Sequence, residues 1–163
     1  MKKLFALIIS VMALTGCDLD DNPLYYKLPD ITNIAYTPEL ESITANDEVA
    51  VSATIINYYG IGYACVKYWV CDNTWGEQMP ELKIEADVLY CWVEPQAEGE
   101  QGEWKKLATM KHSTMAEIVG SSPFKLEGVI PKQKAGKFVT FSVFCTNDYG
   151  INDYSKCYHY TVQ

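Results

Sequence analysis

The strongest constraint on the fold is a period-two alternation of apolar and polar residues, which recurs through residues 30–163. In the run 48–57, Val49, Val51, Ala53 and Ile55 all fall on one face of an extended chain. Runs of this kind are separated by Asn, Asp, Gly and Pro, a pattern typical of β-strands joined by turns. We therefore predict an all-β domain of roughly seven to nine antiparallel strands, the number that a β-sandwich uses.

The predicted strands cover 31–36, 48–57, 64–71, 82–93, 104–110, 124–130, 137–146 and 158–162. One helical turn fits the pattern, at 114–119, and we assign it to a loop. The strand 64–71 is apolar on both faces except for Lys67. One face carries Ala64, Val66, Tyr68 and Val70, and the other carries Cys65, Lys67, Trp69 and Cys71.

The N-terminus has the form of an export signal. Residues 1–17 read MKKLFALIISVMALTGC, a short basic start followed by an apolar run that is too brief to span a bilayer. The four residues before and including Cys17 resemble the lipobox of bacterial lipoproteins. This resemblance implies a signal peptide at 1–16 and lipidation of Cys17, which would then attach the chain to a membrane.

Residues 17–29 predict a lipidated acidic tether, because they hold two prolines and no periodic apolar pattern. The acidic residues that follow Cys17 resemble the signal that sends lipoproteins of the Bacteroidetes to the outer face of the outer membrane. A solvated acidic tether explains the same residues. We expect a protein anchored to the outer membrane of the cell envelope, and leave open whether it faces the periplasm or the cell surface.

The negative charge of the chain is concentrated in one segment. The chain has 13 Lys and no Arg against 21 acidic residues, a net charge of −8, and loss of Lys2 and Lys3 with the leader makes it −10. Such a surface excludes nucleic acid as a partner, because phosphates require clustered basic residues. Residues 72–103 hold nine acidic residues against Lys83 alone. We interpret them as an acidic insertion that enlarges a central hairpin, either solvated with a flexible tip or forming a binding surface.

The strand runs also carry a family resemblance. The stretches concerned are 31–61, 63–70, 104–110 and 124–151, and within them FKLEGVIPKQKAGKFVTFSVFCTNDYGI contains an Ile-Pro-x-Gln-x-x-Gly corner. Together they resemble the immunoglobulin-like domains of many secreted proteins and lipoproteins of the Bacteroidetes. The matching positions include Tyr36, Pro38, Asp47, Gly60, Trp104, Met110, Ile130, Pro131, Gln133, Gly136 and Gly150. The resemblance implies an immunoglobulin-like sandwich over 30–163 and says little about function.

We expect no catalysis, cofactor or metal. A nucleophilic site needs a positioned His, and His112 and His159 both lie outside any nucleophile motif. The acidic residues lie on an insertion without an evident cleft, which a glycosidase would need. The loop 147–153 resembles a calcium loop in composition, but a hairpin turn explains its Asn, Asp and Gly residues. No CxxC pair is present to suggest zinc.

Five cysteines remain once Cys17 is set aside. A hairpin centred on Ile151 would place Cys145 opposite Cys157, so these two form the first candidate for a disulfide. Free buried thiols are the alternative, and Cys91 could instead pair with Cys65 or Cys71.

Aromatic residues supply the candidate binding side chains. The chain has 12 Tyr and 4 Trp, residue types that stack on sugars and anchor protein interfaces. Tyr58, Tyr59 and Trp75 are the preferred candidates because they are predicted to lie in loops. The sequence thus favours a non-catalytic envelope lipoprotein with a binding or structural domain and a protein or glycan partner. The alternative is a carbohydrate-binding accessory of a glycan-uptake system.

Overall fold

A computed structural model describes residues 28–57, 60–76, 78–113, 115–118 and 123–163. The prediction of an all-β protein with antiparallel sheets is confirmed: the described residues form three antiparallel sheets and a single short 3-10 turn, η1 (Leu40–Ser42). No helix among them is long and apolar enough to cross a membrane. The predicted signal peptide and most of the predicted tether lie outside the described residues.

The first sheet has three strands in the order β1-β2-β9. They are β1 (Asp30–Thr37), β2 (Val49–Ile56) and β9 (Phe124–Ile130). The alternation seen in the sequence is realised directly, because Val49, Val51, Ala53 and Ile55 are all buried. A bulge between Thr32 and Ala35 interrupts the pairing of β1 with β2.

The second sheet is built on two long strands, β3 (Ile61–Asp72) and β10 (Lys137–Asn147), which pair over almost their full length. On the far edge of β10 lie β11 (Asn152–Tyr154) and β12 (Tyr158–Thr161). On the far edge of β3 lie β7 (Lys111–His112) and β8 (Ala116–Ile118). The prediction of a helical turn at 114–119 is therefore wrong for Ala116–Ile118, whose backbone pairs with β3 instead.

The main core takes side chains from both of these sheets. Its fully buried members include Ile55 of β2, Leu126 of β9, Val66 of β3 and Phe141 of β10. The two sheets approach closely at Gly128, where an added Cβ would lie 2.6 Å from Cγ2 of Val66. The face of β3 that carries Ala64, Val66, Tyr68 and Val70 packs into or against this core, as its alternation predicts.

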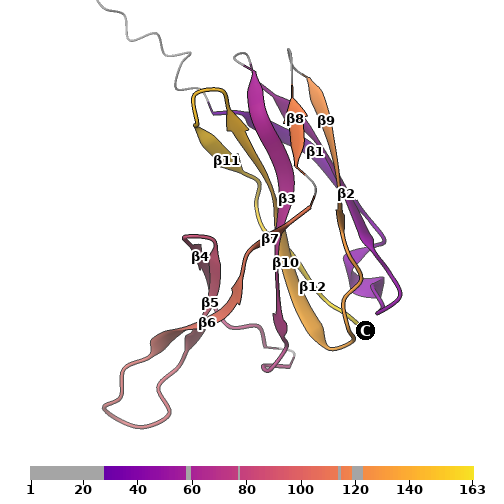
Figure 1. Cartoon of the computed structure of the whole chain (residues 1–163). Coiled ribbons are helices and arrows are strands. Elements are labelled where there is room, and N and C mark those ends of the chain that lie inside the picture. Colours follow the sequence, from indigo (N-terminus) through magenta and orange to yellow (C-terminus); the bar gives the residue numbers. More distant parts are fainter. Residues whose placement is uncertain (1–27, 58–59, 77, 114, 119–122) are drawn as a thin grey trace, which may run out of the picture.

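A third sheet, ordered β4-β5-β6, takes its first two strands from the acidic insertion and nearly all of its last strand from the residues that follow it. Its strands are β4 (Leu82–Glu85), β5 (Val88–Val93) and β6 (Glu103–Thr109), and Figure 1 shows it projecting from one end of the molecule. The prediction of one strand over 82–93 is wrong. The chain reverses at Ala86 and Asp87, whose φ angles are 48° and 63°, so a two-residue turn separates β4 from β5.

The third sheet covers the outer face of the second. Trp69 and Cys71 of β3 and Phe138 of β10 are buried against Leu89 of β5 and Ala108 of β6. Trp69 is fully buried, although its alternation points it away from the main core. The insertion is therefore a folded layer with its own apolar contacts, and a purely solvated hairpin is the wrong description for its base.

Candidate functional site

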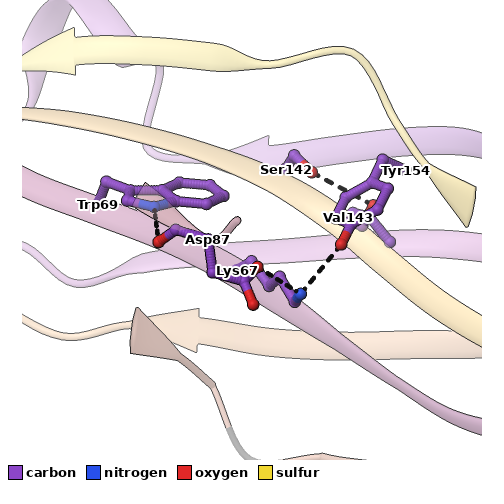
Figure 2. Close-up of polar contacts among 6 residues, drawn as sticks. All are labelled: Lys67, Trp69, Asp87, Ser142, Val143 and Tyr154. Atoms are coloured by element: carbon purple, nitrogen blue, oxygen red, sulfur yellow. Dashed lines mark hydrogen bonds and ion pairs between the residues drawn. The ribbon is translucent and has the colours of Figure 1, made fainter. Parts of the chain in front are cut away.

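The turn between β4 and β5 is fixed to the second sheet by a buried lysine. Lys67 comes from β3, and its side chain lies on the outer face of the sheet with 9% exposure. Its Nζ donates to Asp87 Oδ1 at 2.9 Å and to the Tyr154 hydroxyl at 3.1 Å, as Figure 2 shows. The ammonium also lies 3.9 Å from the centre of the Phe144 ring, a cation–π contact.

These contacts keep Lys67 charged. Burial by itself lowers the pKa of a lysine, but the hydrogen bonds that Lys67 donates to Asp87 and Tyr154, together with the charge of Asp87, outweigh it, so the pKa of Lys67 is raised. A charged ammonium at this depth requires its carboxylate partner, because an unpaired buried charge is strongly destabilising. The ion pair therefore fixes where the turn can sit.

The backbone of Asp87 is held as well. Its carbonyl oxygen accepts hydrogen bonds from Trp69 Nε1 at 3.0 Å and from the amide of Met110 at 2.9 Å. Asp87 thus joins β3 through both its side chain and its main chain. The β4–β5 turn is rigidly placed against the second sheet, and this placement creates the groove described next.

Two adjoining hollows lie between the third sheet and the outer face of β10, β11 and β12, and they share Ile84 and Cys157. We call them together the hairpin groove. The first, of about 380 Å³, is bounded by Ala86 and Asp87 on one side and by Ser142, Tyr154 and Ser155 on the other. The second, of about 390 Å³, is bounded by Met79, Glu81 and Leu82 on one side and by Thr140 and His159 on the other.

The lining of the groove is chemically mixed. Its walls combine apolar side chains, serine hydroxyls and the Asp87 carboxylate. Desolvation raises the pKa of the Cys157 thiol, which therefore stays protonated at neutral pH. The ring of His159 stacks on Phe138 with the ring centres 5.9 Å apart. No hydrogen bond between Cys157 and His159 is present in the described part of the chain.

Of the predicted binding aromatics, Tyr58 and Tyr59 lie outside the described residues, as does the predicted lipidation site Cys17. Trp75 is half-buried and packs edge-on against Phe138, with ring centres 5.1 Å apart. It supports the contact between the third and second sheets and does not line the hairpin groove.

The predicted 147–153 hairpin is confirmed, but its register differs from the one on which the disulfide prediction depended. Cys145 pairs with Asp153, so the hairpin is centred on Tyr149 and not on Ile151. Cys145 is buried in the main core, whereas Cys157 is exposed, and both are free thiols, as are Cys65, Cys71 and Cys91.

The turn of this hairpin is stabilised by its own residues. The Asn147 side-chain oxygen accepts from the amides of Tyr149 at 3.0 Å and Ile151 at 2.9 Å, and Gly150 has a φ of 76°. Among the described residues, no group of three or more His, Cys, Asp or Glu is placed to hold a metal ion.

The residues that hold the β4–β5 turn beside the groove, Lys67, Asp87 and Tyr154, were not among the candidate site residues predicted from the sequence. Lys67 does carry a signal, since it is the only charged residue in the apolar run 64–71. Asp87 and Tyr154 carry none, because their roles depend on a turn that lacks glycine and on the register of β11.

Comparison of the sequence with protein-family models and curated proteins, and of the structure with solved structures, finds no match.

Proposed function

We propose that this protein is a non-catalytic lipoprotein of the bacterial cell envelope whose immunoglobulin-like β-sandwich binds a partner in the hairpin groove. The observation that carries the binding role is the groove itself, in which Met79, Ile84 and Tyr154 remain 45%, 38% and 46% exposed. Exposed large apolar side chains that line one groove are typical of binding sites. The sandwich is supported by the main core, which draws on both the first and the second sheet.

The anchor is supported by the leader and by Cys17 at its end. In a bacterial host, the wild-type protein should incorporate labelled palmitate and sediment with the outer membrane. The variant Cys17→Ser should lose both properties, whereas Cys157→Ser, which also removes one thiol, should keep both. Palmitate labelling of Cys17→Ser at the wild-type level would refute the anchor. Protease treatment of intact cells then separates a surface location from a periplasmic one.

The binding role can be tested with a photo-crosslinking amino acid placed at Ile84, in the groove. The matched control is Val129 of β9, which is 48% exposed on the first sheet. Irradiation of intact cells should give a discrete adduct from position 84 and none from position 129. Equal adducts from both positions would contradict a binding role for the groove.

A second candidate is carbohydrate binding, and the first hollow favours it. Tyr154 offers a partly exposed ring beside the Asp87 carboxylate and the Ser142 and Ser155 hydroxyls, a combination that suits a sugar. Affinity electrophoresis in gels containing neutral polysaccharides should retard the wild-type protein, and Tyr154→Ala should migrate freely. Unretarded wild-type migration across the polysaccharides would dispose of this candidate.

A further inference from the structure

Strand β4 is paired on one side only. It borders β5 in the order β4-β5-β6, and no other described strand pairs with it. The amide of Trp92 donates to the Glu81 carbonyl at 2.9 Å, and Lys83 faces Tyr90 two residues further along. Since hydrogen-bonded pairs alternate along an antiparallel ladder, the N–H and C=O groups of Leu82 and Ile84 point away from β5.

This free edge borders the hairpin groove. Leu82 and Ile84, whose backbone groups face outward, also contribute side chains to the groove wall. A chain lying along β4 would therefore meet unpaired backbone groups on one side and two hollows beneath alternate residues. A strand of a partner protein uses both features, since main-chain hydrogen bonds give affinity and pockets for alternate side chains give specificity.

The charge around β4 selects the kind of chain that fits. Glu81 precedes β4 and Glu85 ends it, and residues 72–103 as a whole carry nine acidic residues against Lys83 alone. The nearest other lysines of the third sheet, Lys105 and Lys106, lie two strands away on β6. Lys83 and Glu85 offset each other, since Lys83 Nζ lies 3.0 Å from Glu85 Oε2 and 4.6 Å from the centre of the Trp104 ring. Glu81 is then the acidic side chain next to β4 that no lysine of the described residues pairs with. A segment with Lys or Arg side chains would complement this surface, and an acidic segment would be repelled.

We propose that an extended, lysine- or arginine-containing segment of a partner protein pairs with β4 as an added strand and places apolar side chains in the hairpin groove. This inference rests on the proposed binding function and names the chemistry of the partner. The Lys67–Asp87 ion pair and the Trp69 hydrogen bond hold the β4–β5 hairpin in place before binding. The edge is thus preorganised, which reduces the entropy lost on association.

The test uses the full-length protein in a neutral detergent and three fluorescein-labelled octapeptides at physiological salt. The first alternates lysine and valine, the second has the same sequence with N-methyl groups on alternate amides, and the third alternates glutamate and valine. Fluorescence anisotropy should show saturable binding of the first peptide. The second should bind about tenfold more weakly, because it keeps the charge and loses the main-chain donors. The third should not bind.

Variants of the protein locate the site. Ile84→Pro removes the outward N–H of β4 and leaves the β4–β5 ladder intact, because proline is tolerated on an edge whose N–H faces solvent. It should weaken binding of the lysine–valine peptide about tenfold. Ile84→Val keeps the N–H and should bind normally. Glu81→Lys should weaken binding more than Glu98→Lys, which makes the same charge change on the β5–β6 loop.

Three results would overturn the inference: no saturable binding of the lysine–valine peptide, equal binding of its N-methylated form, or equal losses from Glu81→Lys and Glu98→Lys. The last would mean unspecific attraction to an acidic surface. Labelled neutral oligosaccharides are tested as a fourth ligand, beside the three octapeptides. Their binding in place of the peptide, abolished by Tyr154→Ala, would overturn the strand-addition proposal and leave the binding function of the groove standing.

Discussion

At the scale of single residues, Lys67 shows how one charged side chain organises a surface. It stands in the run 64–71, whose other residues are apolar or aromatic, and its side chain positions the β4–β5 turn. The carboxylate of Asp87 is about half exposed, so solvent screens part of their attraction, and the pair is weaker than a fully buried one.

Asp87→Asn should lower the free energy of unfolding by about 1–2 kcal/mol, because the Lys67 ammonium keeps its burial and loses its counter-charge. Urea denaturation followed by circular dichroism measures the change. Glu85→Gln is the matched control, since its ion pair with Lys83 is more exposed and should change stability by less than about 0.5 kcal/mol. The double variant Lys67→Met, Asp87→Asn should recover part of the loss. If Glu85→Gln were the more damaging change, the role assigned to Lys67 would be wrong.

The buried thiols predict a loss of stability at alkaline pH. Burial raises the pKa of Cys145 to about 12, from a usual value of 9.0. The stability that this protonated thiol contributes is fully present below pH 9 and is lost as the pH rises towards 12, because the unfolded chain releases the proton first. The slope should reach at most about 1.4 kcal/mol per pH unit for this thiol.

Denaturation in urea at pH 7, 9, 10 and 11 should therefore show a flatter decline for Cys145→Ala than for the wild type. Taking the difference between the two proteins cancels the other groups that titrate in this range, Lys67 and Cys71 among them. Parallel stability curves from pH 9 to pH 11 would show that Cys145 titrates normally in the fold.

At the scale of elements, the sequence predicted the six longer strands of the first two sheets, β1, β2, β3, β9, β10 and β12, each of which has one face in the main core. It missed the short strands β7, β8 and β11 at the edges of the second sheet. It failed at the β4–β5 turn. Ala86 adopts a left-handed conformation without being glycine or asparagine, so no local signal marks the reversal. The strain is tolerated because Asp87 is tied to β3 by contacts between residues far apart in the sequence.

The β4–β5 turn predicts a gain in stability, in contrast to the loss predicted for Asp87→Asn. Ala86→Gly should raise the free energy of unfolding by about 0.5–1 kcal/mol, because glycine relieves the left-handed strain by more than the entropy it adds to the unfolded chain. Ala97→Gly on the β5–β6 loop is the control and should leave stability equal or lower, since Ala97 has no positive φ. Thermal denaturation of both variants measures the difference. If Ala97→Gly stabilised the protein and Ala86→Gly left its stability unchanged, the backbone of Ala86 would not be strained.

At the scale of the molecule, the acidic insertion divides into two parts. Its base is held by the buried cluster around Trp69, Leu89 and Phe138. Its tip, the β5–β6 loop at 94–102, is mostly exposed, and the Glu100 carboxylate accepts hydrogen bonds there from the amides of Gln96 and Ala97. The candidate site lies at the base. Sequence patterns could not reveal this site. Alternation predicts the strands of each sheet, but it does not predict how the second and third sheets pack against each other.

Replacement of residues 95–102 by Asn-Gly should therefore change the free energy of unfolding by less than about 0.5 kcal/mol, since the removed residues lie outside the buried clusters. Binding of the lysine–valine peptide should fall less than it does in Ile84→Pro. Chemical denaturation and anisotropy on the same preparation give both values. Loss of peptide binding with unchanged stability would transfer the binding role to the tip.

Trp69 and Phe138 are buried on the outer face of the second sheet, beneath the third sheet. We therefore expect the third sheet and the surface beneath it to change together in evolution. Leu89 and Ala108 of the third sheet pack over these two side chains, and the loop residue Trp75 packs against Phe138. In a homologue that lacks the third sheet, the same positions would face water, and large apolar residues there would promote aggregation. We expect homologues without the insertion to carry polar residues at the positions of Trp69 and Phe138. The insertion and the surface beneath it would then be gained and lost together.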